Sequence, residues 1–64
     1  MIHVYTKERH VIKIDNFLNS IQLDHKIFTS ISESQSENFE LGVSYCFPKR
    51  ISESLLRMAK KGFV

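Results

Sequence analysis

The chain has 64 residues, a net charge of +2 and a single cysteine, Cys46. This length allows one domain with a small core, and the lone cysteine excludes an intramolecular disulfide. No segment approaches the roughly 18 apolar residues that a membrane span needs, and the first ten residues lack the apolar stretch of a signal peptide. We therefore expect a cytoplasmic protein in which Cys46 is a small buried side chain.

The charge is distributed unevenly. Residues 1–46 carry four Lys or Arg against six Asp or Glu, whereas residues 47–64 carry five against one, so the two parts have net charges of −2 and +4. A basic C-terminal part is compatible with a phosphate or nucleic-acid partner. It is equally typical of the solvated face and last turn of a helix, where cations interact favourably with the helix dipole. We favour the second interpretation.

The first half of the chain predicts a strand, a helix and another strand. Residues 2–6 alternate and are rich in β-branched and aromatic side chains, which predicts a short strand. Residues 11–14 form either a second strand, in a hairpin with the first, or irregular structure. A helix is expected over residues 15–22, capped by Asp15 or Asn16, with its apolar face formed by Phe17, Leu18 and Ile21. Residues 26–30 are expected to form a strand.

The second half begins with a polar stretch at residues 32–38, which is expected to be a loop. Residues 39–47 predict the clearest strand of the chain, because Leu41, Val43, Tyr45, Cys46 and Phe47 are nearly continuous apolar residues. Such a run is typical of a strand covered on both faces in a parallel sheet. Pro48 ends the strand because it has no N–H to donate.

A helix is predicted over residues 52–61. Ser52 is a suitable N-cap, and the apolar face consists of Leu55, Leu56, Met58 and Ala59. Gly62 suits the left-handed position after the helix, and Phe63 is expected to fold back on Met58. The whole pattern predicts one α/β domain over residues 1–64, a partial doubly wound (Rossmann-like) and mostly parallel sheet with two helices. Phe63 and Val64 would begin a further strand.

The residue pattern contains no recognisable catalytic or metal site. His3, His10 and His25 lack the spacing of metal ligands, and the last two are expected to be exposed in loops beside acidic neighbours. Ser44 lies outside any G-x-S-x-G motif. With only two glycines, the chain has no phosphate-binding glycine loop.

Residues 45–64, YCFPKRISESLLRMAKKGFV, resemble the segment before the active site of the folate-dependent N-formyltransferases. That family includes methionyl-tRNA, sugar and glycinamide ribonucleotide formyltransferases. Phe47 stands at the family's aromatic position, and residues 49–52 stand where the glycinamide branch has Arg-Ile-Leu-Ser. Gly62 matches the family's glycine, and residues 63–64 match the apolar pair before its catalytic Asn.

The resemblance implies a partial N-terminal domain that binds 10-formyltetrahydrofolate. Its pterin-binding turn carries over to Phe47, Pro48, Lys49, Arg50 and Ile51, with Phe47 as an apolar wall. Pro48 departs from the tRNA branch, which usually has Gly there. The catalytic Asn, His and Asp have no counterpart at matching positions, so no catalytic residue is assigned. From the residues alone, an ordinary strand-to-helix turn with solvated cations is the favoured interpretation.

The implied function is transfer of a formyl group from 10-formyltetrahydrofolate to an amine, with these 64 residues inactive by themselves. Within a longer protein the amine would be an aminoacyl-tRNA, an amino sugar or glycinamide ribonucleotide. The alternatives are a small cytoplasmic regulatory or nucleic-acid-binding module using the basic C-terminal helix, and an interaction protein that pairs a strand edge with a partner.

The resemblance also aligns residues 2–6 and 41–47 with the family's second and fourth strands, between which the first strand would lie. Without that strand the two either pair directly or expose unpaired edges. In both cases we expect a partly unfolded or self-associating chain.

Overall fold

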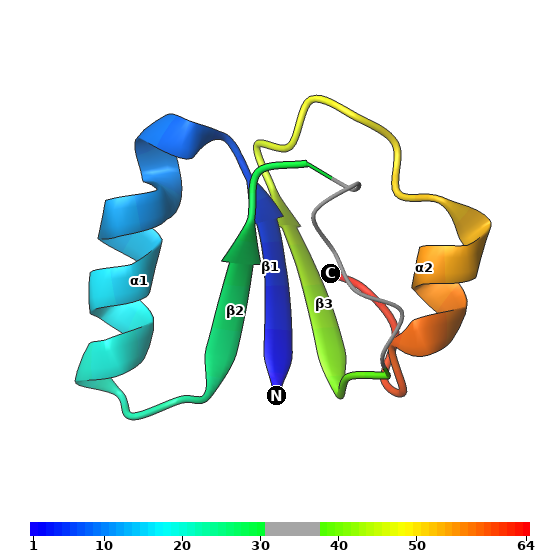
Figure 1. The fold of residues 1–64 in the computed structure, drawn as a ribbon. Coiled ribbons are helices and arrows are strands. Elements are labelled where there is room, and N and C mark those ends of the chain that lie inside the picture. Colours follow the sequence, from blue (N-terminus) through cyan, green and yellow to red (C-terminus); the bar gives the residue numbers. More distant parts are fainter. Residues whose placement is uncertain (31–37) are drawn as a thin grey trace.

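The computed structural model describes residues 1–30 and 38–64, so nearly all of the loop expected at residues 32–38 lies outside the described residues. Strands β1 (Ile2–Thr6), β2 (His25–Phe28) and β3 (Leu41–Tyr45) form one sheet, in which both pairings are parallel. Helix α1 (Val11–Ser20) follows β1 and helix α2 (Glu53–Met58) follows β3, and the two helices lie on opposite sides of the sheet (Figure 1). The expected α/β class with a parallel sheet and two helices is confirmed.

The strand order is β2-β1-β3, so β1 is the central strand. Val4 pairs with Ile27 of β2 on one side and with Val43 of β3 on the other. β1 is accordingly the most buried strand, with Val4, Tyr5 and Thr6 at most 3% exposed. Residues 2–6 and β3 therefore pair directly, which is the first of the two arrangements considered in the sequence analysis.

Residues 62–64 run beside the outer edge of β3. The Gly42 N–H donates to the Gly62 carbonyl, and the Val64 N–H donates to the Gly42 carbonyl, both at 3.0 Å. Gly42 and Phe63 form a parallel bridge. The apolar pair after the second helix therefore pairs in parallel with the strand before that helix, as the βαβ pattern predicts.

The first helix begins earlier than predicted. α1 starts at Val11, after a short 3₁₀ turn η1 (Glu8–His10), so a strand at residues 11–14 is wrong and Asp15 lies inside the helix instead of capping it. Val11, Ile14 and Leu18 are spaced by three and four residues, which places them on one helix face, and Leu18 is buried. The helix ends before Gln22, whose φ of 56° is left-handed.

The second helix is capped as predicted but ends earlier. The Leu55 N–H donates to Ser52 Oγ at 3.3 Å. The helix stops at Met58 because the next residues pair with another segment: the Phe39 N–H donates to the Met58 carbonyl, and the Lys60 N–H donates to the Phe39 carbonyl. Gly62 has the expected left-handed conformation, with φ of 81°.

The core lies between the sheet and α2. It consists of Tyr5, Phe28, Phe39, Leu55 and Ala59, with Phe47, Ile51, Met58 and Phe63 packed against it. The Phe63 ring contacts Tyr5 and Phe39, with centroids 5.8 and 5.9 Å away. A Cβ on Gly42 would lie 2.4 Å from the Phe63 ring, so the glycine makes room for that ring.

β3 is less covered than its sequence predicts. Val43 is only partly buried, Tyr45 is 46% exposed, and Cys46 is exposed with a left-handed φ of 52°. The expectations of a strand covered on both faces and of a buried Cys46 are therefore wrong. The reason is that α1 packs against β2, which lies on the other side of the central strand from β3.

Candidate functional site

The predicted cofactor turn leaves the carboxyl end of β3. The segment that leads from β1 into α1 leaves the same edge of the sheet, at the top of Figure 1, because the strands are parallel. This edge is also where the strand order reverses, since β2 lies on one side of β1 and β3 on the other. In open α/β sheets, ligands bind in the crevice at such a point, outside the carboxyl ends of the strands.

A partly buried hydrogen bond holds the two strands together at this edge. Thr6 is fully buried, and its Oγ1 donates to the Tyr45 carbonyl at 2.7 Å. The next residue, Cys46, has the left-handed backbone conformation. That conformation costs a non-glycine residue of order 1 kcal/mol or more, so the surrounding contacts must hold it in place. The Thr6 hydrogen bond and the contacts around Cys46 thus both fix the position at which the turn begins.

The turn is anchored in the core at both ends and open between them. Phe47 is partly buried, and its ring meets Tyr5 edge-on with centroids 5.8 Å apart. Ile51 packs against the core cluster from the other end. Pro48, Lys49 and Arg50 between them are exposed. The structure therefore brings the five predicted residues together as one loop, in which Phe47 and Ile51 are also packing residues.

His10 is a residue at this edge that sequence reasoning missed. It was expected in an exposed loop, but it is partly buried, and its ring meets Tyr45 edge-on with centroids 5.2 Å apart. Its Nε2 atom is buried and has no hydrogen-bond partner in the described part of the chain. The helical spacing that begins at Val11 could have predicted this position, because it makes His10 the N-cap residue of the helix.

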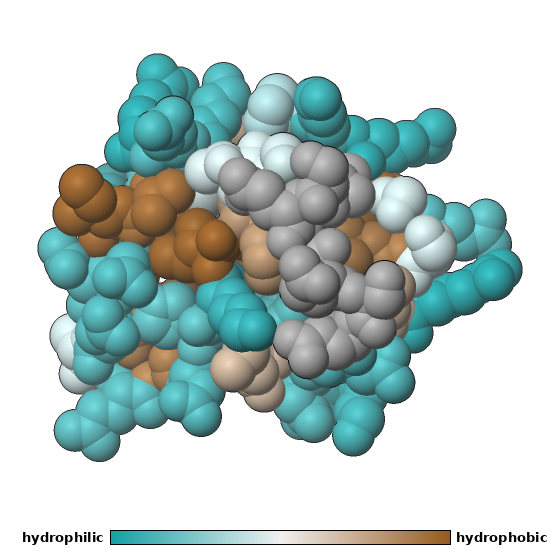
Figure 2. All heavy atoms as spheres, viewed as in Figure 1, coloured by the Kyte–Doolittle hydropathy of each residue, from teal (hydrophilic) through white to brown (hydrophobic). Residues whose placement is uncertain are grey.

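The two segments at this edge are mainly basic. Lys7, Arg9, Lys49 and Arg50 are exposed there, and Glu8 is the only acidic residue of the two segments. Hydrophilic side chains accordingly dominate the upper edge of the molecule in Figure 2. An apolar wall at Phe47 beside exposed cations is suited to a flat ligand that carries negative charge. No three metal-ligating side chains come together within residues 1–30 and 38–64.

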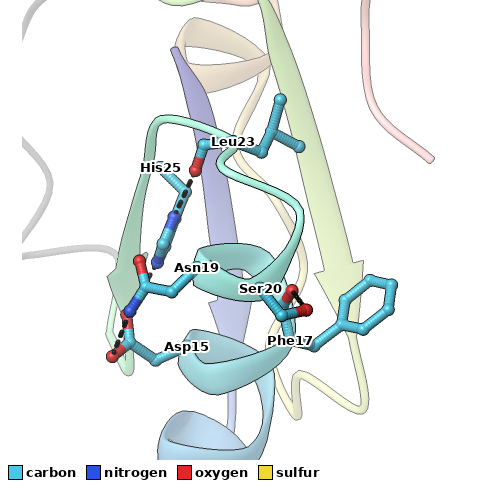
Figure 3. Close-up of polar contacts among 6 residues, drawn as sticks. All are labelled: Asp15, Phe17, Asn19, Ser20, Leu23 and His25. Atoms are coloured by element: carbon cyan, nitrogen blue, oxygen red, sulfur yellow. Dashed lines mark hydrogen bonds and ion pairs between the residues drawn. The ribbon is translucent and has the colours of Figure 1, made fainter.

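A second polar cluster joins α1 to β2 (Figure 3). His25 was expected in an exposed loop, but it lies in β2 and its side chain is only 7% exposed. Its Nδ1 lies 2.7 Å from the Leu23 carbonyl and its Nε2 lies 2.7 Å from Asp15 Oδ1. The Leu23 carbonyl, followed by the Asp15 carboxylate, raises the pKa of His25. Both partners are acceptors, so the protonated ring, which donates from both nitrogens, fits this position.

A hollow of about 450 Å³ lies at the opposite, amino end of the strands. Its lining contains none of the predicted site residues and consists of Met1, Ile2, Gln22, Leu23, Asp24, Glu40, Leu41 and Lys61. The hollow and the predicted turn therefore do not coincide. We assign the candidate ligand site to the turn, because ligands of parallel sheets bind at the carboxyl ends of the strands.

The basic residues of the second helix are partly paired with acids. Arg57 donates to Glu53 at 2.7 Å, and Lys60 lies 3.7 Å from Glu40. Both pairs are exposed and contribute little to stability. They nevertheless reduce the positive charge that this helix offers to a nucleic acid.

Comparisons with protein-family models, with curated proteins and with solved structures gave no match. Within the described residues, no helix has the length and apolar character that crossing a bilayer requires.

Proposed function

We propose that these 64 residues belong to the formyl-folate-binding domain of an N-formyltransferase, and that the turn Phe47, Pro48, Lys49, Arg50 and Ile51 binds 10-formyltetrahydrofolate. The observation that carries the proposal is the position of this turn, at the carboxyl end of β3 beside the central strand. The resemblance of residues 45–64 and the ligand rule for parallel sheets point independently to the same segment.

The strand order supports the finer fold assignment. Counting residues 62–64 as the start of a fourth strand, the order is 2-1-3-4, which is that of doubly wound sheets of the flavodoxin-like type. In this reading residues 2–6 are the first strand of the sheet, and the reversal point lies between β1 and β3. The resemblance instead aligns residues 2–6 with the family's second strand and puts the first strand between them and residues 41–47, so the observed order supports a doubly wound sheet but not that alignment.

The proposed roles follow from the geometry of the turn. The exposed backbone of residues 48–50 offers N–H and C=O groups to the edge of the pterin, and the Phe47 ring supplies an apolar wall. Lys49 and Arg50 are free to attract the glutamate carboxylates of the folate tail. The anchoring of Phe47 on Tyr5 keeps the loop in one conformation, which lowers the entropic cost of binding.

The proposal assigns binding, and not catalysis, to the described residues. Formyl transfer needs an amine nucleophile, a general base and donors that stabilise an oxyanion, and the family's Asn, His and Asp have no counterpart at matching positions here. The acceptor amine, whether aminoacyl-tRNA, amino sugar or glycinamide ribonucleotide, would react in a protein that contains these groups. The 64-residue chain should show no formyl transfer above background.

An NMR titration tests the proposal. The ¹⁵N-labelled chain is titrated with 5-formyltetrahydrofolate, a stable isomer of the proposed cofactor. We expect the largest amide shifts in residues 46–51 and in residues 6–10, at the same edge of the sheet. Phe47→Leu should weaken binding, whereas Leu56→Ala, on the exposed side of α2, should not. Shifts confined to the residues around Leu23 and Leu41, or no saturable shift, would contradict it.

A nucleic-acid-binding module receives less support, because Arg57 and Lys60 of the basic segment face acidic partners. The same titration with a short RNA separates the two functions. Binding that weakens steeply and linearly on a log–log plot of affinity against salt would favour the nucleic-acid function.

A further inference from the structure

One face of β3 is apolar and exposed. Thr6 pairs with Tyr45 and Val4 pairs with Val43, so these β3 side chains lie on the same face of the sheet as Val4. That is the face of α1, because His25, which pairs with Ile2, reaches Asp15 of α1 from it. Tyr45 is 46% exposed, and Leu41 and Val43 are only partly buried. The ring of His10, in η1, meets Tyr45 edge-on, whereas α1 packs against β2 on the other side of the central strand.

One flank of α1 borders the uncovered face. Phe17 and Ile21, one helical turn apart, are 61% and 52% exposed. Figure 3 views the sheet from the α1 side and shows the Phe17 ring projecting from the helix toward the β3 side, away from His25. Leu23, which follows the helix, points the same way in this view.

The hollow at the amino end of the strands continues this surface. Leu23 from the α1 side and Leu41 from β3 both line it, together with Ile2 of the central strand. The helix flank, β3 and the hollow lie on the same side of the sheet, and we call this apolar surface the α1–β3 surface. Its residues are Phe17, Ile21, Leu23, Leu41, Val43 and Tyr45.

The exposed area of these apolar residues is large for a monomer. Side chains of this size present about 150–250 Å² when fully exposed, so the exposed fractions of Phe17, Ile21, Leu23 and Tyr45 leave roughly 400 Å² uncovered. A monomer rarely exposes a contiguous apolar patch above a few hundred Å². A specific dimer buries about 800 Å² on each partner, of which somewhat more than half is apolar. The patch therefore supplies nearly the apolar area that one side of such an interface needs.

We propose that the α1–β3 surface binds a second copy of this chain, with the Phe17–Ile21 flank of each copy lying on the β3 face of the other. Parallel sheets are normally covered by helices on both faces, and the covering element that β3 lacks is an apolar helix flank. The molecule carries that flank beside the uncovered strand. A single two-fold axis between the two copies therefore completes both sheets at once, as in an isologous interface. The inference does not depend on the cofactor assignment.

Sedimentation equilibrium of the intact chain over a wide concentration range tests the proposal. We expect a reversible monomer–dimer equilibrium. Phe17→Ser and Ile21→Ser should each raise the dissociation constant about tenfold or more, because each removes a large apolar side chain from the centre of the interface. Ile12→Ser is the matched control: Ile12 is 75% exposed on a different side of the same helix, and its removal should leave the dissociation constant unchanged.

A second measurement keeps the test independent of variant folding. In a mixture of labelled and unlabelled wild-type chains, an isotope-filtered NOE experiment should show contacts between the Phe17 ring of one copy and the Val43 methyl groups of the other. A wild-type chain that stays monomeric, a dimer that Ile12→Ser weakens as much as Phe17→Ser does, or open-ended assembly beyond the dimer would each overturn the proposal.

Discussion

The two faces of the sheet are built differently. The α2 face is closed by aromatic rings: His3 stacks on Phe39 with centroids 4.1 Å apart, and Tyr5 stacks on Phe28 at 5.2 Å. The α1 face is closed over β2, where the His25–Asp15 contact fastens the helix, and remains open over β3. Stability is thus concentrated on one face, and the surface available to a partner lies on the other.

This difference bears directly on the candidate site. Phe47 and Ile51, which hold the predicted cofactor turn, both pack into the closed face. Thr6, which fastens the carboxyl ends of β1 and β3, is fully buried. The turn is therefore attached to the closed face, and of the residues of the α1–β3 surface Tyr45 adjoins it, through the Thr6 hydrogen bond and the His10 ring.

The largest effect is expected from truncating the closed face. Leu55→Ala removes a side chain that is 3% exposed and should cost about 3 kcal/mol. A core of this size supplies only roughly 3–5 kcal/mol, so most of the stability would be lost. Leu56→Ala, one residue away and 43% exposed, should cost less than about 1 kcal/mol. Urea unfolding measures both, and equal losses would show that the closed face is not the core.

A smaller loss is expected from Gly42→Ala. The new methyl group would lie 2.4–2.5 Å from the Phe63 ring, which must move away from Tyr5 and Phe39. Overpacking of this kind costs about 1–2 kcal/mol, at the lower end because the ring can swing aside. In a Phe63→Ala background the same substitution should cost much less. Additive losses in the double variant would contradict the contact.

The elements that the sequence predicts well are those determined by local chemistry. The alternation of Ile2–Thr6 predicts β1, the hydroxyl of Ser52 predicts the cap, and Gly62 predicts the left-handed turn. The predicted start of the first helix, at residue 15, is wrong, although the spacing of Val11, Ile14 and Leu18 indicates an earlier start. At residues 11–14 the β-branched side chains of Val11, Ile12 and Ile14 favour a strand and the helical period favours a helix, and the structure follows the helical period.

A pH-dependent loss of stability is expected from the His25–Asp15 contact, which joins α1 to β2. Because the folded-state pKa of His25 is raised, its protonation favours the folded chain. The stabilisation is complete below the unfolded pKa of about 6.5 and is lost as the pH rises through the higher folded pKa. The loss should be of order 1 kcal/mol, since it concerns hydrogen bonds to a charged ring.

Urea unfolding between about pH 5.5 and 8.5 measures this loss, and Asp15→Asn is the matched variant because it removes the carboxylate but keeps the size. The decline with pH should be smaller in the variant. Stability that rises with pH in the wild type would contradict the assignment.

The smallest effect on stability is expected on the open face. Phe17→Ser removes a ring that is 61% exposed, so the free energy of unfolding at concentrations below dimerisation should change by no more than about 0.5 kcal/mol. The rings of the closed face, by contrast, include the buried side chains of Tyr5, Phe28 and Phe39. A loss above 2 kcal/mol under those conditions would show that Phe17 belongs to the core of the monomer.

The candidate site was only partly predictable. A strand followed by Pro48 and a capped helix was enough to predict a turn at residues 47–51. The contact of Phe47 with Tyr5 and the position of His10 beside Tyr45 join residues more than 30 apart in sequence, and they depend on the strand order. The exposure of Cys46 depends equally on which helix covers β3, a relation that no local pattern contains.

The most direct test of the cofactor assignment is a set of intermolecular NOEs between bound 5-formyltetrahydrofolate and the ¹³C-labelled chain. The account predicts contacts from the folate protons to the Phe47 ring and to the Ile51 methyl groups, at the carboxyl end of β3. Contacts only to Leu23 and Leu41, at the amino end of the strands, would contradict it.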